Sequence, residues 1–134
     1  MLEKRTIETG RPAELVDLTQ EVAALVAASG ITEGVAVVTT QAADAGIICT
    51  ARRDPKIWED ILDDFHRIWP ARNDFFAQGA PEVCAAHTKA AVAGQGMDFI
   101  VENGALCLGK DQGIFFAEYC GPQTRSYCVK VLGR

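Results

Sequence analysis

The two histidines of this sequence are its side chains best suited to acid/base chemistry near neutral pH, because the ordinary imidazole pKa lies close to it. His87 stands among the small residues of segment 84–90, which would leave its ring accessible near the start of a helix. There it fits a general acid/base, a metal ligand or an ordinary surface position. His66 lies in an acidic helical segment and fits a partly exposed surface position. Two histidines are too few for a three-histidine zinc site.

Glu118 and Arg125 form a second group of candidates, one on each side of a glycine-proline pair at 121–122. Glu118 comes late in an apolar run, where a carboxylate either points to solvent or serves a site. Arg125 offers a guanidinium group that binds anions, or equally an edge-strand charge that discourages aggregation. The glycine-rich stretch 109–113, which contains Gln112, matches neither a phosphate-binding loop nor a dinucleotide fingerprint and is more typical of a strand connection.

The five cysteines are odd in number and include no CxxC pair. This pattern favours neither a disulfide framework nor a thiol-rich zinc site, and structural roles are expected. Cys107 and Cys128 lie in apolar runs, where buried thiols behave as small hydrophobic groups. The roles of Cys49 and Cys120 stay open, since Cys120 sits beside the glycine-proline pair at the end of a predicted strand.

The composition predicts one soluble domain over residues 1–134. The chain is 49% hydrophobic, which is enough for one core, and its net charge of -5 would repel phosphodiester backbones. No apolar run approaches the roughly 18 to 20 residues that cross a bilayer. The N-terminal segment lacks the apolar stretch of a secretory signal. We therefore expect a cytoplasmic protein with no nucleic-acid and no membrane partner.

Three helices are predicted from apolar spacing and capping residues. The first follows Asp17, with either Asp17 or Thr19 as its cap, and ends at Gly30. The second begins at Asp54-Pro55 and has an apolar face, which extends to Ile68, opposite a solvated acidic one. The third spans residues 83–93, and its many alanines favour close packing against a sheet.

The remaining apolar segments are typical of strands. They cover residues 2–9, 35–40, 45–50, 97–101, 105–108, 114–119 and 126–132. Asn103-Gly104 predicts a tight hairpin between 97–101 and 105–108, and a second hairpin is expected between 114–119 and 126–132. Because regular helical crossovers are absent between the strands, the order favours an α+β fold with a largely antiparallel sheet.

A collinear set of short motifs resembles the YjbQ-like (secondary thiamine-phosphate synthase) family over nearly the whole chain. In the C-terminal half the motifs are Ala86-His87, Glu102-Asn103-Gly104, Gln112-Gly113-Ile114, Glu118, Gly121-Pro122 and Arg125. In the N-terminal half they are Asp17-Leu18-Thr19, Ser29-Gly30-Ile31, Ala45-Gly46-Ile47 and Asp54-Pro55.

This resemblance implies a mostly antiparallel β-sandwich with about three helices, assembled as a homotrimer. It also implies a weak transferase activity that joins a pyrimidine pyrophosphate to a thiazole phosphate. A divalent metal (Mg, Mn or Zn) is the usual means of stabilising the departing pyrophosphate. On this resemblance His87 and Glu118 are the catalytic residues, with His87 also a metal ligand, and Arg125 and Gln112 contact the phosphorylated substrate.

The sequence departs from the family pattern at its polar positions. The family's His-Thr-Thr run corresponds to Ala42, Ala43 and Asp44 here, and its Asn-Glu pair corresponds to Thr50 and Ala51. Apolar or small residues also replace the polar ones at 83–85, just before His87. Asp44 lies two positions after Ala42, so it is the candidate to replace the missing histidine as a metal ligand.

Two hypotheses follow from these departures. In the first, the protein is a divergent thiamine-phosphate synthase-type transferase that uses His87 with Glu118 and Arg125. In the second, it is a non-catalytic trimeric scaffold that binds a small molecule or a protein partner, as the alanines at 42, 51 and 85 favour.

Overall fold

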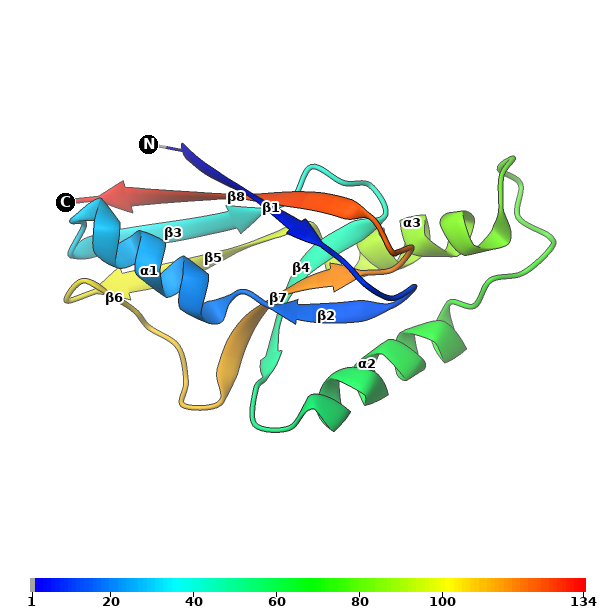
Figure 1. Ribbon diagram of the computed structural model, residues 1–134, viewed down its shortest axis with the longest axis horizontal. Helices are drawn as coiled ribbons and strands as arrows, with labels where there is room; N and C mark the ends of the chain where they lie inside the picture. Colours follow the sequence, from blue (N-terminus) through cyan, green and yellow to red (C-terminus); the bar gives the residue numbers. More distant parts are fainter. Residues whose placement is uncertain (1) are drawn as a thin grey trace.

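The structure, a computed structural model, describes residues 2–134 and is built from three helices and eight strands in that range (Figure 1). The helices are α1 (Thr19–Ser29), α2 (Pro55–Ile68) and α3 (Pro81–Ala93). The strands are β1 (Leu2–Glu8), β2 (Glu14–Asp17), β3 (Glu33–Thr39), β4 (Ala45–Ala51), β5 (Gly96–Glu102), β6 (Ala105–Leu106), β7 (Gln112–Glu118) and β8 (Thr124–Gly133).

The strands form two sheets in which every pairing is antiparallel. Sheet A has the order β1-β8-β3-β5-β6, and sheet B has the order β2-β7-β4. The α+β class and the antiparallel sandwich expected from the sequence are thus confirmed.

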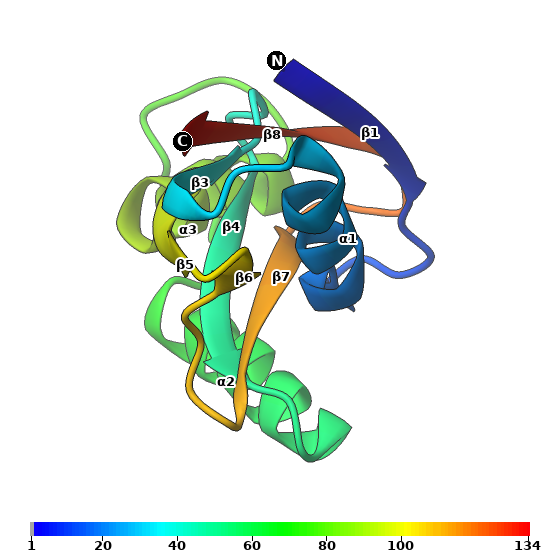
Figure 2. The same ribbon diagram turned by 90° about the vertical axis from the view of Figure 1, so that its left-hand side faces the viewer.

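The main core lies between the two sheets. Alternate side chains of β3 and β8, among them Val38 and Tyr127, face Ile47 and Phe116 of sheet B. Helix α1 closes the same layer with Val22, so it lies on the same side of sheet A as sheet B (Figure 2). Successive side chains of a strand point to opposite faces of its sheet, so every second residue lies on this buried face.

A second, smaller core lies on the far face of sheet B, where α2 and α3 pack (Figure 1). Ala86 and Ala90 of α3 are buried there, as the alanine-rich pattern predicted. Trp58 of α2 packs edge-on against Phe115 of β7, with 4.8 Å between ring centroids. A side chain at Gly46 of β4 would meet the Gly94 carbonyl oxygen at 2.4 Å, so glycine allows the close approach of β4 to the end of α3.

The predicted end of α1, the start of α2 and the first hairpin are confirmed, but the predicted N-terminal cap of α1 is wrong. The N-cap position of α1 is Leu18, and no side chain caps it, although the Asp17 carboxylate accepts a hydrogen bond from the Thr19 backbone N–H at 2.9 Å. Gly30 ends α1 with a φ of 72°. Asp54 caps α2 by accepting from the Lys56 N–H at 3.0 Å. Asn103 and Gly104 have φ of 53° and 76°, as a tight turn between β5 and β6 requires.

The second predicted hairpin is wrong. Strand β7 pairs with β2 and β4 in sheet B, whereas β8 pairs with β1 and β3 in sheet A. Residues 119–123 carry the chain from one sheet to the other. Alternation and a turn signal are the same for a hairpin and for a crossing between sheets, so the local pattern does not distinguish them.

Three further details differ from the prediction. Strand β2 was missed, because only Leu15 of its four residues is buried and the pattern is short. Ile68, expected on the packed face of α2, is 62% exposed, and Cys107, expected to be buried, is exposed. Within residues 2–134, no helix combines the length and apolar character needed to span a membrane.

Candidate functional site

Three of the candidate residues meet at one end of the sandwich. Arg125 comes from the inner face of β8, Glu118 from the end of β7, and Asp44 from the residues just before β4. The Arg125 guanidinium donates from Nε and Nη2 to the two oxygens of Glu118, at 2.8 and 2.6 Å. Its Nη1 donates to Asp44 Oδ1 at 2.8 Å. The group forms an ion-pair network that ties sheet A to sheet B.

Glu118 is fully buried and keeps its charge. Burial raises the pKa of a carboxyl group, but here the hydrogen bonds from Arg125, the Cys120 N–H and Thr9 outweigh burial and hold the Glu118 pKa below its usual range. The bonds from Cys120 and Thr9 are 3.0 and 2.8 Å long. The two carboxylates in turn raise the pKa of Arg125. The network is therefore charged, and Arg125 is already neutralised.

This neutralisation bears on the predicted phosphate contact. Nε, Nη1 and Nη2 of Arg125 all donate to carboxylate oxygens, and the residue is only 8% exposed. A phosphate would have to displace Asp44 from the guanidinium before Arg125 reached it. The geometry is that of a structural tie.

His87 and Gln112 lie apart from this network. His87 is exposed on α3, and the bonding partners of Glu118 do not include it. Gln112 is exposed at the start of β7, where its Oε1 accepts a hydrogen bond from the Gly109 N–H at 2.7 Å and closes the local turn.

A divalent metal does not fit the residues predicted to bind it. The Asp44 carboxylate accepts a hydrogen bond from Arg125 and is paired with it, and His87 stands on the exposed side of α3. In the described part of the chain, no three His, Cys, Asp or Glu side chains are placed to surround one ion. A stable site for such a cation needs more oxygen or nitrogen ligands than this pair supplies.

Next to the network lies a cavity of about 260 Å³, which we call the Lys89 pocket. It is enclosed by α2, α3, the segment before β2 and the residues that follow β7. Its lining includes His66, Glu82, Ala85, Lys89, Tyr119 and Cys120.

Lys89 is the most unusual residue of this pocket. It is only 9% exposed, and within residues 2–134 no hydrogen bond or ion pair engages its amine. Burial lowers the pKa of Lys89, and the nearby Cys120 opposes this shift only in part. Because no partner in the described structure compensates this burial, the lowered pKa increases the neutral fraction of the Lys89 amine.

Tyr119 and Cys120 stand beside it as protonated groups. Tyr119 is 6% exposed, its hydroxyl has no hydrogen-bond partner in the described structure, and burial raises its pKa. Burial and the carboxylates of Asp44 and Glu118 raise the pKa of Cys120. The pocket therefore presents hydrogen-bond donors that lack acceptors.

Sequence reasoning missed Lys89 and Tyr119. A usable signal was present, because Lys89 falls four residues after Ala85 and three after Ala86, on the alanine face that packs on sheet B. A lysine on the buried face of a helix is uncommon unless it is paired.

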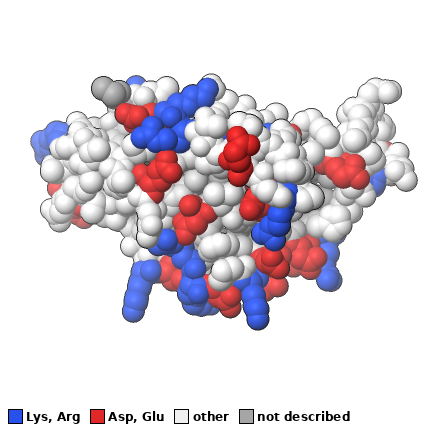
Figure 3. All heavy atoms as spheres, viewed as in Figure 1, with Lys and Arg blue, Asp and Glu red and all other residues white. Residues whose placement is uncertain are grey.

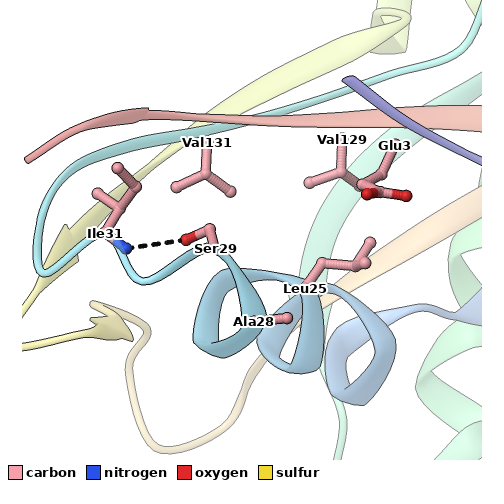
Figure 4. A pocket seen from close by; sticks show the side chains of 7 residues that line it. All are labelled: Glu3, Leu25, Ala28, Ser29, Ile31, Val129 and Val131. Atoms are coloured by element: carbon pink, nitrogen blue, oxygen red, sulfur yellow. Dashed lines mark hydrogen bonds between the residues drawn. The ribbon is translucent and has the colours of Figure 1, made fainter. Parts of the chain in front are cut away.

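A groove between α1 and sheet A is a weaker candidate (Figure 4). Its walls are largely apolar, with Leu25, Val129 and Val131 among them. The Ser29 hydroxyl accepts a hydrogen bond from the Ile31 N–H at 3.1 Å (Figure 4) and donates to the Val26 carbonyl at 2.6 Å, so the serine has partners within the fold. The groove offers little for recognising a polar ligand.

The charged surface around the β4–α2 connection is also paired. Figure 3 shows basic and acidic side chains intermixed on the face it presents, without a large area of one sign. Arg52 donates to Asp17 at 2.8 Å, and Arg53 pairs with Asp111. These pairs are exposed and leave Lys110 as the remaining cation of a wide surface depression.

The fold and site define a small α+β sandwich protein with an inter-sheet ion-pair network and an adjacent amine-lined pocket. The chain belongs to the YjbQ-like family: the family model described as UPF0047 protein YjbQ-like matches residues 3–134. The resemblance expected from the sequence is thereby confirmed.

Relatives and solved structures agree with this assignment. The chain is 36% identical to UPF0047 protein YugU of Bacillus subtilis, over 99% of this chain and 100% of that protein. It is 34% identical to UPF0047 protein MJ1081 of Methanocaldococcus jannaschii, over 99% and 95%. A crystal structure of a yjbq/upf0047 family protein from Clostridium acetobutylicum superimposes with a TM-score of 0.91 at 34% identity, covering 97% of this chain and 99% of that one.

Proposed function

We propose that this protein is a non-catalytic member of its family that binds a small oxygen-bearing molecule in the Lys89 pocket. The observation that carries the proposal is that one cavity is lined both by Lys89, which is 9% exposed and has no bonding partner in the described structure, and by Tyr119, whose buried hydroxyl has none either. A buried donor without an acceptor costs about 1–3 kcal/mol. A ligand oxygen that accepts from these donors would offset that cost.

The size and polarity of the pocket narrow the ligand class. A volume of about 260 Å³ lies just below the range of roughly 300–1,000 Å³ that is typical of ligand sites, so the ligand must be small. The donors favour carboxylate, carbonyl or hydroxyl oxygens, and the walls at Pro12, Ala13 and Ala71 favour a short carbon chain. A small carboxylic acid is the simplest molecule that meets both conditions.

The transferase hypothesis has less support. Arg125 is neutralised by Glu118 and Asp44. The two predicted ligands, His87 and Asp44, do not form a site for a divalent metal in the described part of the chain. Ala42, at the position of a family histidine, packs against the main hydrophobic core. Pyrophosphate release needs cations that are free to meet the developing charge.

The proposal is tested by measuring the binding of lactate and pyruvate with calorimetric titration. We expect both acids to bind to the wild-type protein and Lys89→Met to weaken binding at least about tenfold, since a hydrogen bond to a charged group contributes roughly 1.5–3 kcal/mol. Lys56→Met, which removes an exposed lysine of α2, is the matched control and should bind like the wild type. Equal affinities of the Lys89→Met variant and the wild type would overturn the proposal.

A thiamine-phosphate synthase assay with added Mg, Mn or Zn separates the two hypotheses. The proposal expects no activity above background. Activity that disappears in His87→Ala would instead support the transferase.

We also propose that the outer face of sheet A mediates self-association, in line with the expected homotrimer. Three large apolar side chains on this face are cross-strand neighbours: Val35 pairs with both Ile100 and Leu132, and they are 37%, 64% and 51% exposed. A contiguous apolar patch of this kind is typical of an interaction surface.

Sedimentation equilibrium tests this surface. We expect the wild-type protein to form a trimer and Ile100→Glu to raise its dissociation constant at least about tenfold, because each copy of the variant would bury an unpaired carboxylate. Val92→Glu, which changes an exposed valine of α3, should leave the assembly unchanged. A monomeric wild type, or an Ile100→Glu variant that associates normally, would contradict the expectation.

A further inference from the structure

We infer that Lys89 forms an imine with the carbonyl group of a small aldehyde or keto acid held in its pocket. The inference rests on the proposed function, because it assigns a covalent step to the same ligand site. It narrows the ligand class from any small oxygen-bearing acid to one that carries an aldehyde or ketone.

Two nucleophiles line the pocket, and their surroundings distinguish them. Burial lowers the pKa of Lys89, which increases the share of the neutral, nucleophilic amine. The opposite holds for Cys120, whose pKa is raised by burial and by nearby carboxylates, so that less of the reactive thiolate forms. The amine is therefore the group that reacts with a carbonyl carbon here.

The amine is also sheltered and free to react. Lys89 is 9% exposed and has no hydrogen bond or ion pair with any residue of the described chain, so no bond must break before attack. The cavity leaves about 260 Å³ beside it, enough for a three- or four-carbon carbonyl compound.

The step balances without an oxidant or reductant. The lone pair of the Lys89 nitrogen forms a bond to the carbonyl carbon, and the carbonyl π electrons move to the oxygen, which gains a proton as the nitrogen loses one. The resulting carbinolamine loses its hydroxyl group together with the remaining nitrogen proton as water, and a carbon–nitrogen double bond forms.

Proton exchange during this step has candidates in the same lining. Tyr119, Glu82 and His66 all border the cavity. The Tyr119 hydroxyl stays protonated and has no other partner in the described structure, so it is free to donate a hydrogen bond to the ligand oxygen.

Reductive trapping tests the inference. The wild-type protein is incubated with pyruvate and cyanoborohydride near pH 7, and the modified peptides are quantified by mass spectrometry. We expect the adduct to form on Lys89 in clear preference to Lys56, because burial lowers the pKa of Lys89 and the pocket holds the carbonyl group beside its amine. In urea, where the pocket is lost, the two lysines should react alike.

Lactate is the matched ligand, because it has the same carbon chain and carboxylate but no ketone. It should bind without giving an adduct. If pyruvate binds in the titration but Lys89 reacts no more than Lys56, the imine inference fails and the proposed binding function stands. If neither acid binds, both fail.

Discussion

Replacing Arg125 by methionine is expected to lower the free energy of unfolding by about 3–5 kcal/mol, because the change leaves a buried carboxylate without its cation. Glu118 is fully buried and accepts two bonds from Arg125, at 2.8 and 2.6 Å. The loss should be measured by urea denaturation, followed by circular dichroism. Most natural domains have only about 5–15 kcal/mol of stability, so this variant will be close to unfolding.

An exposed ion pair serves as the control. Arg67 donates to Asp63 at 2.9 Å on the surface of α2, and both side chains are largely exposed. Arg67→Met should change the free energy of unfolding by less than about 1 kcal/mol. The double variant Arg125→Met/Glu118→Leu should recover much of the stability lost in Arg125→Met, because it removes the orphaned charge. A small effect of Arg125→Met would show that water reaches Glu118.

Acid should weaken the same network in the wild-type protein. The Glu118 pKa is lower in the folded state than its ordinary value near 4.5, so folding favours the charged form. Its contribution is complete above that ordinary value and decreases as the pH falls from about 4.5 through the folded pKa. Urea denaturation across this window should show a steeper loss of stability in the wild type than in Arg125→Met/Glu118→Leu.

Replacing Phe116 by alanine is expected to cost about 3–5 kcal/mol of unfolding free energy, because it opens a cavity in the main core. Phe116 is fully buried on β7, among side chains from both sheets and α1. The same measurement applies, urea denaturation followed by circular dichroism.

The chain offers the same substitution at the surface. Phe76 lies in the segment between α2 and α3 and is fully exposed. Phe76→Ala should leave the free energy of unfolding within about 0.5 kcal/mol of the wild type. If both variants lost equal stability, the assignment of the core to the layer between the sheets would be wrong.

Much of the fold was predictable from short-range signals. Asp54-Pro55, Gly30 and Asn103-Gly104 each fixed an element boundary, because caps and tight turns depend on a few neighbouring residues. The assignment of β7 and β8 to different sheets was not predictable in this way. It depends on pairing with β1, β2 and β4, which lie far away in the sequence.

The candidate site shows the same limit. Glu118 and Arg125 were identified, but their mutual neutralisation required the two sheets to be placed face to face. The resemblance drew attention to His87, which lies on the exposed side of α3, and not to Lys89 two residues later on the buried side. Burial and the absence of a partner in residues 2–134 gave Lys89 its chemistry, and neither property is encoded at a single position.

The position of β8 in sheet A has a consequence for how the protein folds during synthesis. Strand β8 lies between β1 and β3, and its pairs join residues as distant as Leu2 and Lys130. Sheet A therefore cannot form completely until residues 124–133 have been made. Until then, the edges of β1 and β3 that pair with β8 keep backbone N–H and C=O groups without partners. Long-range pairing of this kind slows folding and leaves edges open to aggregation. Chaperone dependence of the nascent chain should thus be greatest just before β8 appears.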